Sequence, residues 1–299
     1  MTTPVSLLCV VLMATCAARQ QSPDSPEDVV RSTPEAERIV DLRTGEDVEE
    51  SALLADLRSV RAIYLGEQHD APLDHAMQYR ILRALYLEDA SLVVGMEMLQ
   101  RPFQPAADQW VAGRLDEESF RRESEWDQRW GVDIRLYRPM LELIRSRAIP
   151  LYALNAPREL TRAVALAGVD GLSEEQRAQL PEMDLENAAH RAMVEAAMAG
   201  HPHGDDSDAF ERLYQAQVVW DETMAESVAN ALEAGGSRIV VFAGSKHVES
   251  GLGIPDRAAR RGVDRYRVVL AAEGEDEEIE ALIEAEPRVA DYLWVHRSN

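Results

Sequence analysis

The sequence predicts an α/β fold with a mainly parallel central sheet flanked by helices, and two observations lead to this prediction. Short apolar runs with the length of strands alternate along the chain with longer helical segments. Each run is nearly continuous in apolar residues, which is typical of parallel strands that helices cover on both faces. The expected strands are residues 62–66, 92–96, 149–154, 239–244, 266–271 and, as a last edge strand, 292–296.

Helices are expected between these strands. Asp70 is placed to cap a helix that begins near Pro72, because an apolar stripe at helical spacing follows it. Two further helices, over residues 139–147 and 157–167, begin with proline, whose missing N–H costs little in a first turn. Residues 100–130 are expected to form another helical excursion from the sheet.

A long stretch after the third strand contains no convincing strand and predicts a helical lobe inserted over the sheet, at about residues 168–235. Ser173 and Gln176 have the spacing of a capping box at the start of a helix in this stretch. A longer helix is expected to run from about Phe210 to a glycine stop at Gly235.

The amino-terminal part of the chain predicts export. Residues 5–14 form an apolar run that is too short to span a bilayer and well sized for the core of a secretory signal. Small residues and then Cys16 follow, which resembles a bacterial lipoprotein signal whose cysteine is acylated. We therefore expect residues 1–18 to be a signal segment and 19–37, rich in Pro, Ser and acidic residues, to be a disordered tether. Residues 38–299 would then form one α/β domain.

These features place the protein in the cell envelope, as a periplasmic lipoprotein that meets a membrane only through its lipid anchor. The alternative is a cytoplasmic protein with an apolar tail. Both cysteines, Cys9 and Cys16, lie within the signal segment, so the predicted domain has no internal disulfide and no thiolate ligand.

Composition and missing motifs exclude several classes of function. The chain has 31 Lys and Arg against 54 Asp and Glu, a net charge of −23. A protein this acidic repels phosphate backbones, so nucleic-acid binding is not expected. The sequence also contains no phosphate-binding loop, no dinucleotide-binding glycine motif, no nucleophile elbow and no His-Glu-x-x-His motif.

Two of the predicted strands end in the same way. A glycine closes the apolar run and a histidine follows three residues later, as Gly66 with His69 and as Gly244 with His247. Ligands of open parallel sheets bind outside the carboxyl ends of the strands, where the following loops meet. We call this edge, with the residues that follow its strands, the rim, and expect the two imidazoles to face one another there.

Other polar side chains are expected at the same rim. Glu67 lies two residues before His69 and would point to the same side of an extended chain, while Glu97 and Asn155 end the next two strands. Imidazole and carboxylate together suit zinc, manganese, cobalt or non-haem iron. A divalent metal held by His69, His247 and Glu67 or Glu97 would lower the pKa of bound water, with one glutamate as general base. The structural alternatives are an ion-pair role for Glu97 and a helix-cap role for Asn155.

Three residues are candidates for a supporting role behind the ligands. His75 either faces the rim or caps an apolar stripe of its helix. Gln217 and Asp221 lie four residues apart on the long helix, where an acid beside an apolar stripe can orient a ligand histidine. The alternative for this pair is the polar flank of an amphipathic helix.

The residues around these positions resemble a known family. The matching segments are 65–70, 96–98, 137–139, 153–158, 217–225, 243–248 and 253–255, together with His75, Gln104, Trp126 and Trp130. They resemble, in order, the ChaN-like haem-binding lipoproteins, which share a superfamily with the Tiki metalloproteases and the erythromycin esterases. The resemblance covers the chain from about residue 39 onward.

The resemblance implies an envelope lipoprotein that binds haem and is linked to iron uptake. It also implies a parallel sheet with a helical lobe, and haem that can lie between two copies of the chain, as a homodimer. In the Tiki relatives, paired Gly-x-x-His elements and a glutamate hold a metal that activates water, a role that here falls on His69 and His247 with Glu67 or Glu97. Tyr137 and a rim histidine, His69 or His247, are the candidates for the haem ligand. The alternatives are therefore a haem-binding protein, a metal-dependent hydrolase and an inert scaffold.

Overall fold

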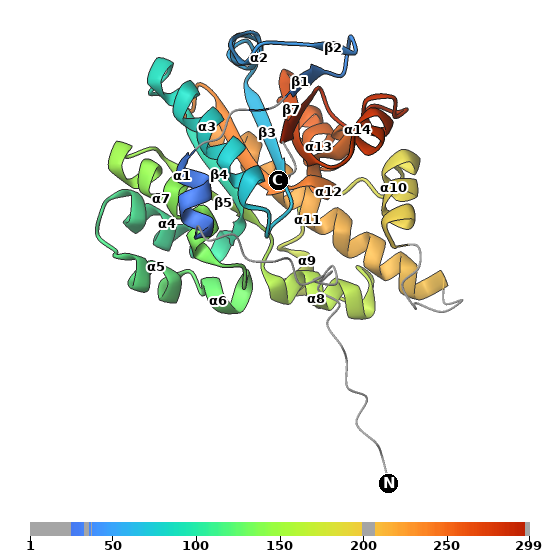
Figure 1. Cartoon of the computed structure of the whole chain (residues 1–299). Coiled ribbons are helices and arrows are strands. Elements are labelled where there is room, and N and C mark those ends of the chain that lie inside the picture. The colour runs from blue at the N-terminus through green and yellow to red at the C-terminus, as the bar shows by residue number, and fades with distance from the viewer. Residues whose placement is uncertain (1–24, 33–35, 37, 199–206, 297–299) are drawn as a thin grey trace.

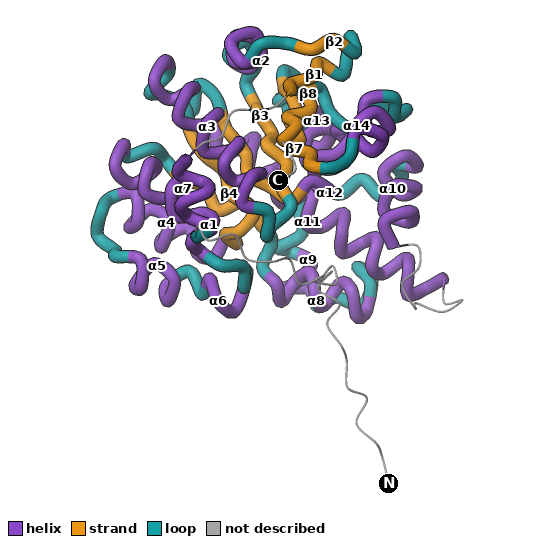
Figure 2. The backbone as a smooth tube through the Cα atoms, viewed as in Figure 1, coloured by secondary structure: helices purple, strands orange, loops and turns teal. Residues whose placement is uncertain are grey.

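The computed structural model describes residues 25–32, 36, 38–198 and 207–296. Its centre is an eight-stranded sheet in the order β2-β1-β8-β7-β3-β6-β4-β5 (Figures 1 and 2). The strands are β1 Arg38–Asp41, β2 Glu46–Asp47, β3 Ala62–Glu67, β4 Val93–Gln100, β5 Leu151–Asn155, β6 Ile239–Gly244, β7 Tyr266–Glu273 and β8 Tyr292–His296. Neighbouring strands from β8 to β5 pair in parallel, and β1 pairs antiparallel with β2 and β8.

This arrangement confirms the predicted α/β fold class, and all six expected strands are present within a few residues of their expected bounds. The predicted position of one strand in the sheet was wrong. The last strand, β8, was expected at an edge but lies between β7 and β1. The strands β1 and β2 that cover it are short and were not predicted, because four and two residues carry too weak a pattern.

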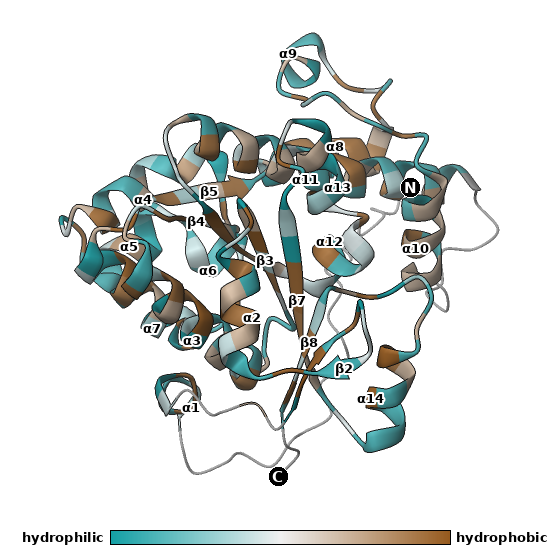
Figure 3. Ribbon diagram, turned by 90° about the horizontal axis from the view of Figure 1, so that it is seen from above, coloured by the Kyte–Doolittle hydropathy of each residue, from teal (hydrophilic) through white to brown (hydrophobic). Residues whose placement is uncertain are grey.

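Helices cover both faces of the sheet, as Figure 3 shows in a view from above. The helices of the first face and the amino-terminal segment are α1 Pro26–Ser32, α2 Glu50–Leu57, α3 Pro72–Glu88, α4 Gln104–Val111, α5 Glu117–Glu123, α6 Trp126–Arg129 and α7 Ile134–Arg147. The later helices are α8 Arg158–Ala167, α9 Glu174–Arg177, α10 Ala188–Met198, α11 Ser207–Glu233, α12 Ser245–Val248, α13 Ile254–Arg260 and α14 Asp276–Ile283. Two short 3₁₀ turns are η1 Arg101–Phe103 and η2 Glu249–Gly251.

The core explains why the strands are apolar on both faces. Ile63 and Leu65 of β3 pack in one cluster with side chains of α2, α3, α4 and α7. Their neighbours Ala62 and Tyr64 point the other way and pack in a second cluster with α11, α13 and α14. Because successive strand residues face opposite layers, a strand between two helical layers must be apolar at every position.

Two helix starts differ from the prediction. Helix α3 begins at Pro72, but its N-cap is Ala71, with no side-chain cap bond, so Asp70 does not cap it. Helix α7 begins at Ile134, where the Asp133 side chain accepts a hydrogen bond from the backbone of the first turn. Pro139 therefore lies inside α7 rather than in its first turn, and the true start is the Asp133 cap.

The predicted helical insertion, about 168–235, is helical in its described part and contains no strand there. The capping box of Ser173 and Gln176 starts α9, as predicted. The long helix α11 ends at Glu233, just before the expected glycine stop. Helix α11 packs directly on the sheet, because its side chains belong to the core cluster on the second face.

The amino-terminal segment is only partly described. Residues 1–24, including Cys16, lie outside the described residues, so the signal and lipidation predictions fall there. Residues 19–37 were predicted to be a disordered tether. Within this range the structure instead has helix α1, which packs against α3 and α7. Arg31 of this helix pairs with Glu142 of α7 at 2.5 Å. Within the described ranges, no helix combines the length and the apolar character needed to cross a membrane.

Candidate functional site

The rim brings together side chains from three parallel strands. The residue pairing of β3 with β6 sets Glu67 beside Gly244, and β4 delivers Glu97 on the other side of β6. A Cβ placed on Gly244 would lie 2.7 Å from His69 Cε1 and 3.6 Å from Glu97 Oε2. His247 Nε2 lies 3.4 Å from Glu97 Oε1. The convergence of two imidazoles and a carboxylate that the sequence predicts is therefore present, and we call His69, His247 and Glu97 the rim cluster.

Glu67 is buried beneath this cluster and accepts several hydrogen bonds. Its Oε1 accepts from the Tyr137 hydroxyl at 2.6 Å and lies 3.0 Å from His69 Nδ1. Its Oε2 accepts from Gln78 Nε2 at 2.8 Å. Burial raises the pKa of Glu67, but the charge of His75 and the hydrogen bonds from His69 and Tyr137 outweigh burial and hold the pKa below its ordinary value.

These contacts make Glu67 a residue that orients His69. An ionised carboxylate can only accept, so a proton of His69 sits on Nδ1, and in the neutral imidazole Nε2 is the atom with the free lone pair. The predicted roles of Glu67, as metal ligand or general base, need carboxylate oxygens that three side chains already occupy. The sequence correctly placed Glu67 beside His69, but not the donors from α3 and α7.

His69 is the accessible imidazole of the cluster. Its side chain is 40% exposed, whereas that of His247 is only 14% exposed. The His69 Nε2 atom has no hydrogen bond within the described part of the chain, and the His69 ring forms a T-shaped pair with that of Trp130, with the ring centroids 4.5 Å apart. Burial lowers the pKa of His69, but the bond to Glu67 and the charge of Glu97 raise it above its ordinary value overall.

Tyr137 and His75 lie below the rim. Tyr137 is fully buried and donates its hydroxyl hydrogen to Glu67. Burial, together with the negative charge of Glu67, raises the pKa of Tyr137 well above its ordinary value, so the phenol stays neutral. The haem-ligand role of Tyr137 stays a prediction, and it would require the hydroxyl to give up its hydrogen bond to Glu67. His75, predicted as a supporting residue, is also fully buried and lies 3.1 Å from the backbone oxygen of His69.

His247 is held from behind by α11. Its Nδ1 lies 2.5 Å from Asp221 Oδ1, and Gln217 Nε2 lies 3.2 Å from the same nitrogen. The other oxygen of Asp221 lies 3.0 Å from Nε2 of His190, on α10. Burial raises the pKa of Asp221, but the two histidines hold it far below its ordinary value. Burial lowers the pKa of His247, yet the charges of Glu97 and Asp221 raise it well above its ordinary value.

Glu97 and Asn155 complete the strand ends. Glu97 is 4% exposed, and its Oε2 accepts from the backbone N–H of Gly244 at 2.7 Å. Burial raises the pKa of Glu97, but the charge of His247 and these hydrogen bonds lower it to about 2. Asn155 donates from Nδ2 to the backbone oxygen of Glu97 at 3.0 Å, and it does not cap α8, whose N-cap is Pro157. Asn155 thus fixes the ends of β4 and β5 relative to each other.

The local sequence does not identify His190 as part of the site. This residue is fully buried and is linked to the rim through Asp221 of another helix, so its neighbours in the sequence cannot reveal its partner. Two tryptophans also border the cluster. Trp130 contacts His69, and Trp220 lies edge-on to His247 at 6.4 Å. Trp130 is one of the single positions that resemble the family, which was the available signal for it.

The predicted divalent metal site finds no support in the arrangement of these side chains. Over the described ranges, no group of three or more His, Cys, Asp or Glu side chains is set to hold a metal ion. The predicted ligands His69, His247, Glu67 and Glu97 instead engage one another and Asp221. The alternative function, a metal-dependent hydrolase, depended on that metal, and no contact at the rim favours it.

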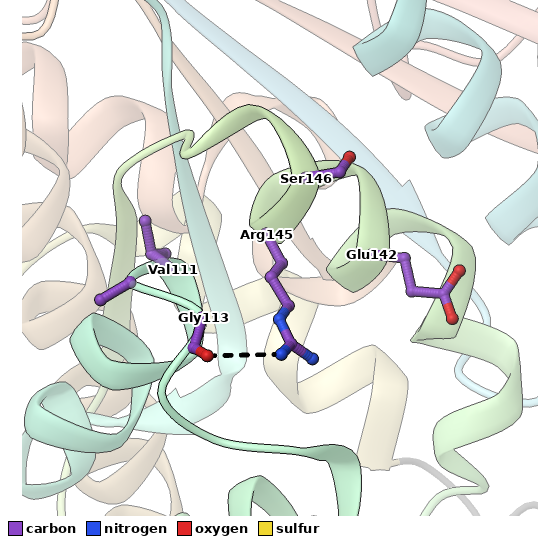
Figure 4. Close-up of a pocket in the computed structure, with 6 residues that line it drawn as sticks. Val111, Gly113, Glu142, Arg145 and Ser146 are labelled. Carbon is purple, nitrogen blue, oxygen red and sulfur yellow. Dashed lines mark hydrogen bonds between the residues drawn. The ribbon is translucent and has the colours of Figure 1, made fainter.

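Two cavities lie away from the rim cluster. One, of about 500 Å³, lies between the end of α4 and the end of α7 (Figure 4) and is lined by Val111, Ala112, Gly113, Glu142, Arg145 and Ser146. Because α7 leads into the start of β5, this cavity lies at the opposite edge of the sheet. The other, of about 350 Å³, lies between α6 and α8 on the rim side. Neither is lined by His69, His247 or Glu97.

The chain is similar to several known proteins. The chain is 28% identical over 261 residues to the protein RETICULATA-RELATED 5, chloroplastic, of Arabidopsis thaliana, covering 80% of this chain and 34% of that protein. The chain thus spans about a third of the length of this curated relative. An erythromycin esterase mutant in its open conformation aligns with a TM-score of 0.48 and 13% identity, over 80% of this chain and 76% of that chain.

A solved structure of ChaN of Campylobacter jejuni, described as showing cofacial haem binding, has the same fold. It aligns with a TM-score of 0.68 and 18% identity, over 86% of this chain and 95% of that chain. A family model described as "Haem-binding uptake, Tiki superfamily, ChaN" matches residues 53–258, which include Glu67, His69, Glu97 and His247. The chain therefore belongs to the ChaN family of haem-binding uptake proteins in the Tiki superfamily.

Proposed function

We propose that this protein binds haem at the rim, where Nε2 of His69 would hold the iron. The observation that carries the proposal is the state of His69: its imidazole is 40% exposed, and Glu67 holds its other nitrogen at 3.0 Å. A carboxylate behind a ligand histidine sets the tautomer and raises the basicity of the ligating nitrogen. Membership of a haem-binding family supports the choice of ligand.

The surroundings of His69 suit a porphyrin. Haem is a flat, largely apolar ring whose iron accepts an imidazole nitrogen, and when bound it supplies an iron centre that changes oxidation state. Trp130 and Trp220 are partly buried and present indole surface beside His69 and His247. His247 is the weaker candidate for the ligand, because Asp221 and Glu97 engage its two nitrogens.

We further infer that a second copy of the chain covers the haem. The His69 side chain is 40% exposed at the rim, so this chain alone does not enclose a group held there. The cofacial haem binding described for ChaN of Campylobacter jejuni supports this inference. Light scattering with and without haemin should show a change from one copy to two on loading. A mass that stays at one copy with saturating haemin would contradict it.

We also propose that the protein is exported, anchored through lipidated Cys16 and linked to iron uptake. The apolar run at residues 5–14 and the cysteine that follows it support this proposal. Cell fractionation should place the parent protein with the envelope membranes, and Cys16→Ser should release it. Equal distribution of the two proteins would exclude the anchor. Loss of growth on haem as the iron source after gene deletion would test the link to uptake.

Haemin titration of the purified chain tests the haem site. We expect a saturable change of the Soret band in the parent protein, and loss of this ligand-dependent change in His69→Ala. Lys246→Ala is the matched control, because Lys246 lies beside His247 but its side chain is 67% exposed and pairs with Glu249. A parent without a saturable change, or a His69→Ala spectrum identical to the parent, would refute the proposal.

A further inference from the structure

Four buried polar side chains come together on three helices behind His247. His190 of α10, Asp221 and Glu222 of α11 and Arg257 of α13 are each 0% or 1% exposed, and α11 contacts both of the other helices (Figure 1). We call these four residues the buried network. A buried charge destabilises a fold unless its partners compensate it, so the direction of each hydrogen bond in the network is informative.

Arg257 decides which nitrogen of His190 carries the proton. Arg257 Nη2 lies 3.1 Å from His190 Nδ1, and because a guanidinium only donates, this imidazole nitrogen accepts. The Tyr214 hydroxyl, 3.5 Å from the same nitrogen, is a second group that can donate to it. The proton of His190 therefore sits on Nε2, which lies 3.0 Å from Asp221 Oδ2 and donates to it. His190 thus links a guanidinium to a carboxylate in one tautomer.

Arg257 is itself held in place by contacts other than His190. Its Nη1 donates to the backbone oxygens of residues 252 and 253 at 2.6 Å and 3.2 Å. Its Nε lies 3.3 Å from Glu222 Oε1, and Glu222 also pairs with Arg260 and Arg261 at 2.5 Å and 2.6 Å. The guanidinium is therefore fixed independently of His190, and it sets the position of the His190 ring.

Asp221 lies between two imidazoles. Its Oδ2 accepts from His190, and its Oδ1 lies 2.5 Å from His247 Nδ1. Gln217 Nε2 lies 3.3 Å from Oδ2 and is the competing donor for that oxygen. Without His190, the carboxylate would be free to turn toward Gln217, and His247 Nδ1 would lose its aligned acceptor.

We propose that His190 is a positioning residue for His247 of the rim cluster, and that Arg257 sets the tautomer in which His190 acts. The inference goes beyond the proposed haem site, because it concerns the chain without haem. It also gives α10 a role. His190 and Val194 are the buried residues of this helix, and Val194 packs in an apolar cluster with α11 rather than in the buried network. The position of α10 is therefore coupled to the rim through the His190 imidazole.

NMR spectra of the full chain with isotope-labelled histidine, recorded without haemin at neutral pH, test this proposal. In the parent, His190 should carry its proton on Nε2 and not on Nδ1. His190→Leu should shift the Nδ1–H signal of His247, which the spectrum of His247→Asn identifies. His190→Gln should restore the signal, because a glutamine amide both donates and accepts. The backbone amides of α10 should exchange with water about tenfold faster in His190→Leu, because a hydrogen bond to a charged group is lost.

Val194→Ala is the matched control. It removes buried side-chain volume from the same helix, so it should also speed amide exchange in α10, but it should leave the His247 signal in place. An unchanged His247 signal in His190→Leu, an equal shift in Val194→Ala, or no restoration in His190→Gln would overturn the proposal. If His190→Leu does not fold, the parent spectrum decides: a proton on Nδ1 of His190 would overturn the proposal, and a proton on Nε2 would support it.

Discussion

The hydrogen bonds of Glu67 predict a large loss of stability in Glu67→Gln. The carboxylate is 2% exposed and accepts from Tyr137, His69 and Gln78 at 2.6 to 3.0 Å. The amide keeps one oxygen, which can accept from Tyr137 and His69. The new amide nitrogen then faces Nε2 of Gln78, and both groups are donors. Gln78 Nε2 also donates to the backbone oxygen of Leu65, so Gln78 cannot turn its amide over without losing that bond.

The magnitude follows from these contacts. Hydrogen bonds to a charged acceptor contribute about 1.5–3 kcal/mol each, and an unsatisfied buried donor costs about 1–3 kcal/mol. One such bond is lost, and the two that remain have a neutral acceptor. We therefore expect the free energy of unfolding to fall by about 3 kcal/mol. Haem affinity should fall less, because the amide oxygen still holds His69.

Urea unfolding at neutral pH, followed by circular dichroism, measures this loss. Glu142→Gln is the control, because the Glu142 side chain is 49% exposed and its pair with Arg31 is expected to contribute about 1 kcal/mol at most. If the free energy of unfolding fell equally in the two variants, Glu67 would not be the charged centre of a buried network. The orientation assigned to His69 would then have no basis.

Three further predictions concern the same rim. Gly244→Ala should weaken haem binding in a haemin titration, because its Cβ would lie 2.7 Å from His69 Cε1; an unchanged affinity would show that the ring moves freely. Tyr137→Phe should lower the free energy of unfolding by about 1–2 kcal/mol, because Glu67 loses a donor, and should leave the Soret position unchanged. A shifted Soret band in that variant would instead make Tyr137 an iron ligand. The pKa of Glu97 is about 2 against an ordinary 4.5, so its contribution to stability is full above 4.5 and is lost as pH falls toward 2. Unfolding measured from pH 7 to pH 3 should show a shallower acid loss in Glu97→Gln than in the parent, and parallel curves would contradict this assignment.

Much of the fold was predictable because its signals are local. Each parallel strand must be apolar on both faces, so the run from Ala62 onward reads as a strand without knowledge of its neighbours. The repeated glycine and histidine then predicted the positions of His69 and His247 at one edge, because parallel strands of one sheet end on the same side. The short strands β1 and β2 were missed because they form by pairing with other strands and have only weak local patterns. The start of α7 was missed because the Asp133 cap, not the proline, sets it.

What only the tertiary structure decided is how each rim side chain is used. Glu67 meets Tyr137 from 70 positions away, and Asp221 meets His190 from 31 positions away. Hydrogen bonds of this kind require the donor and the acceptor to be placed to within a few tenths of an ångström by separate helices and strands, and the spacing of residues in the sequence does not specify this placement. The sequence by itself therefore determined which residues reach the rim, whereas packing determined that Tyr137 is buried, that Glu67 orients its neighbour and that Nε2 of His69 is left open.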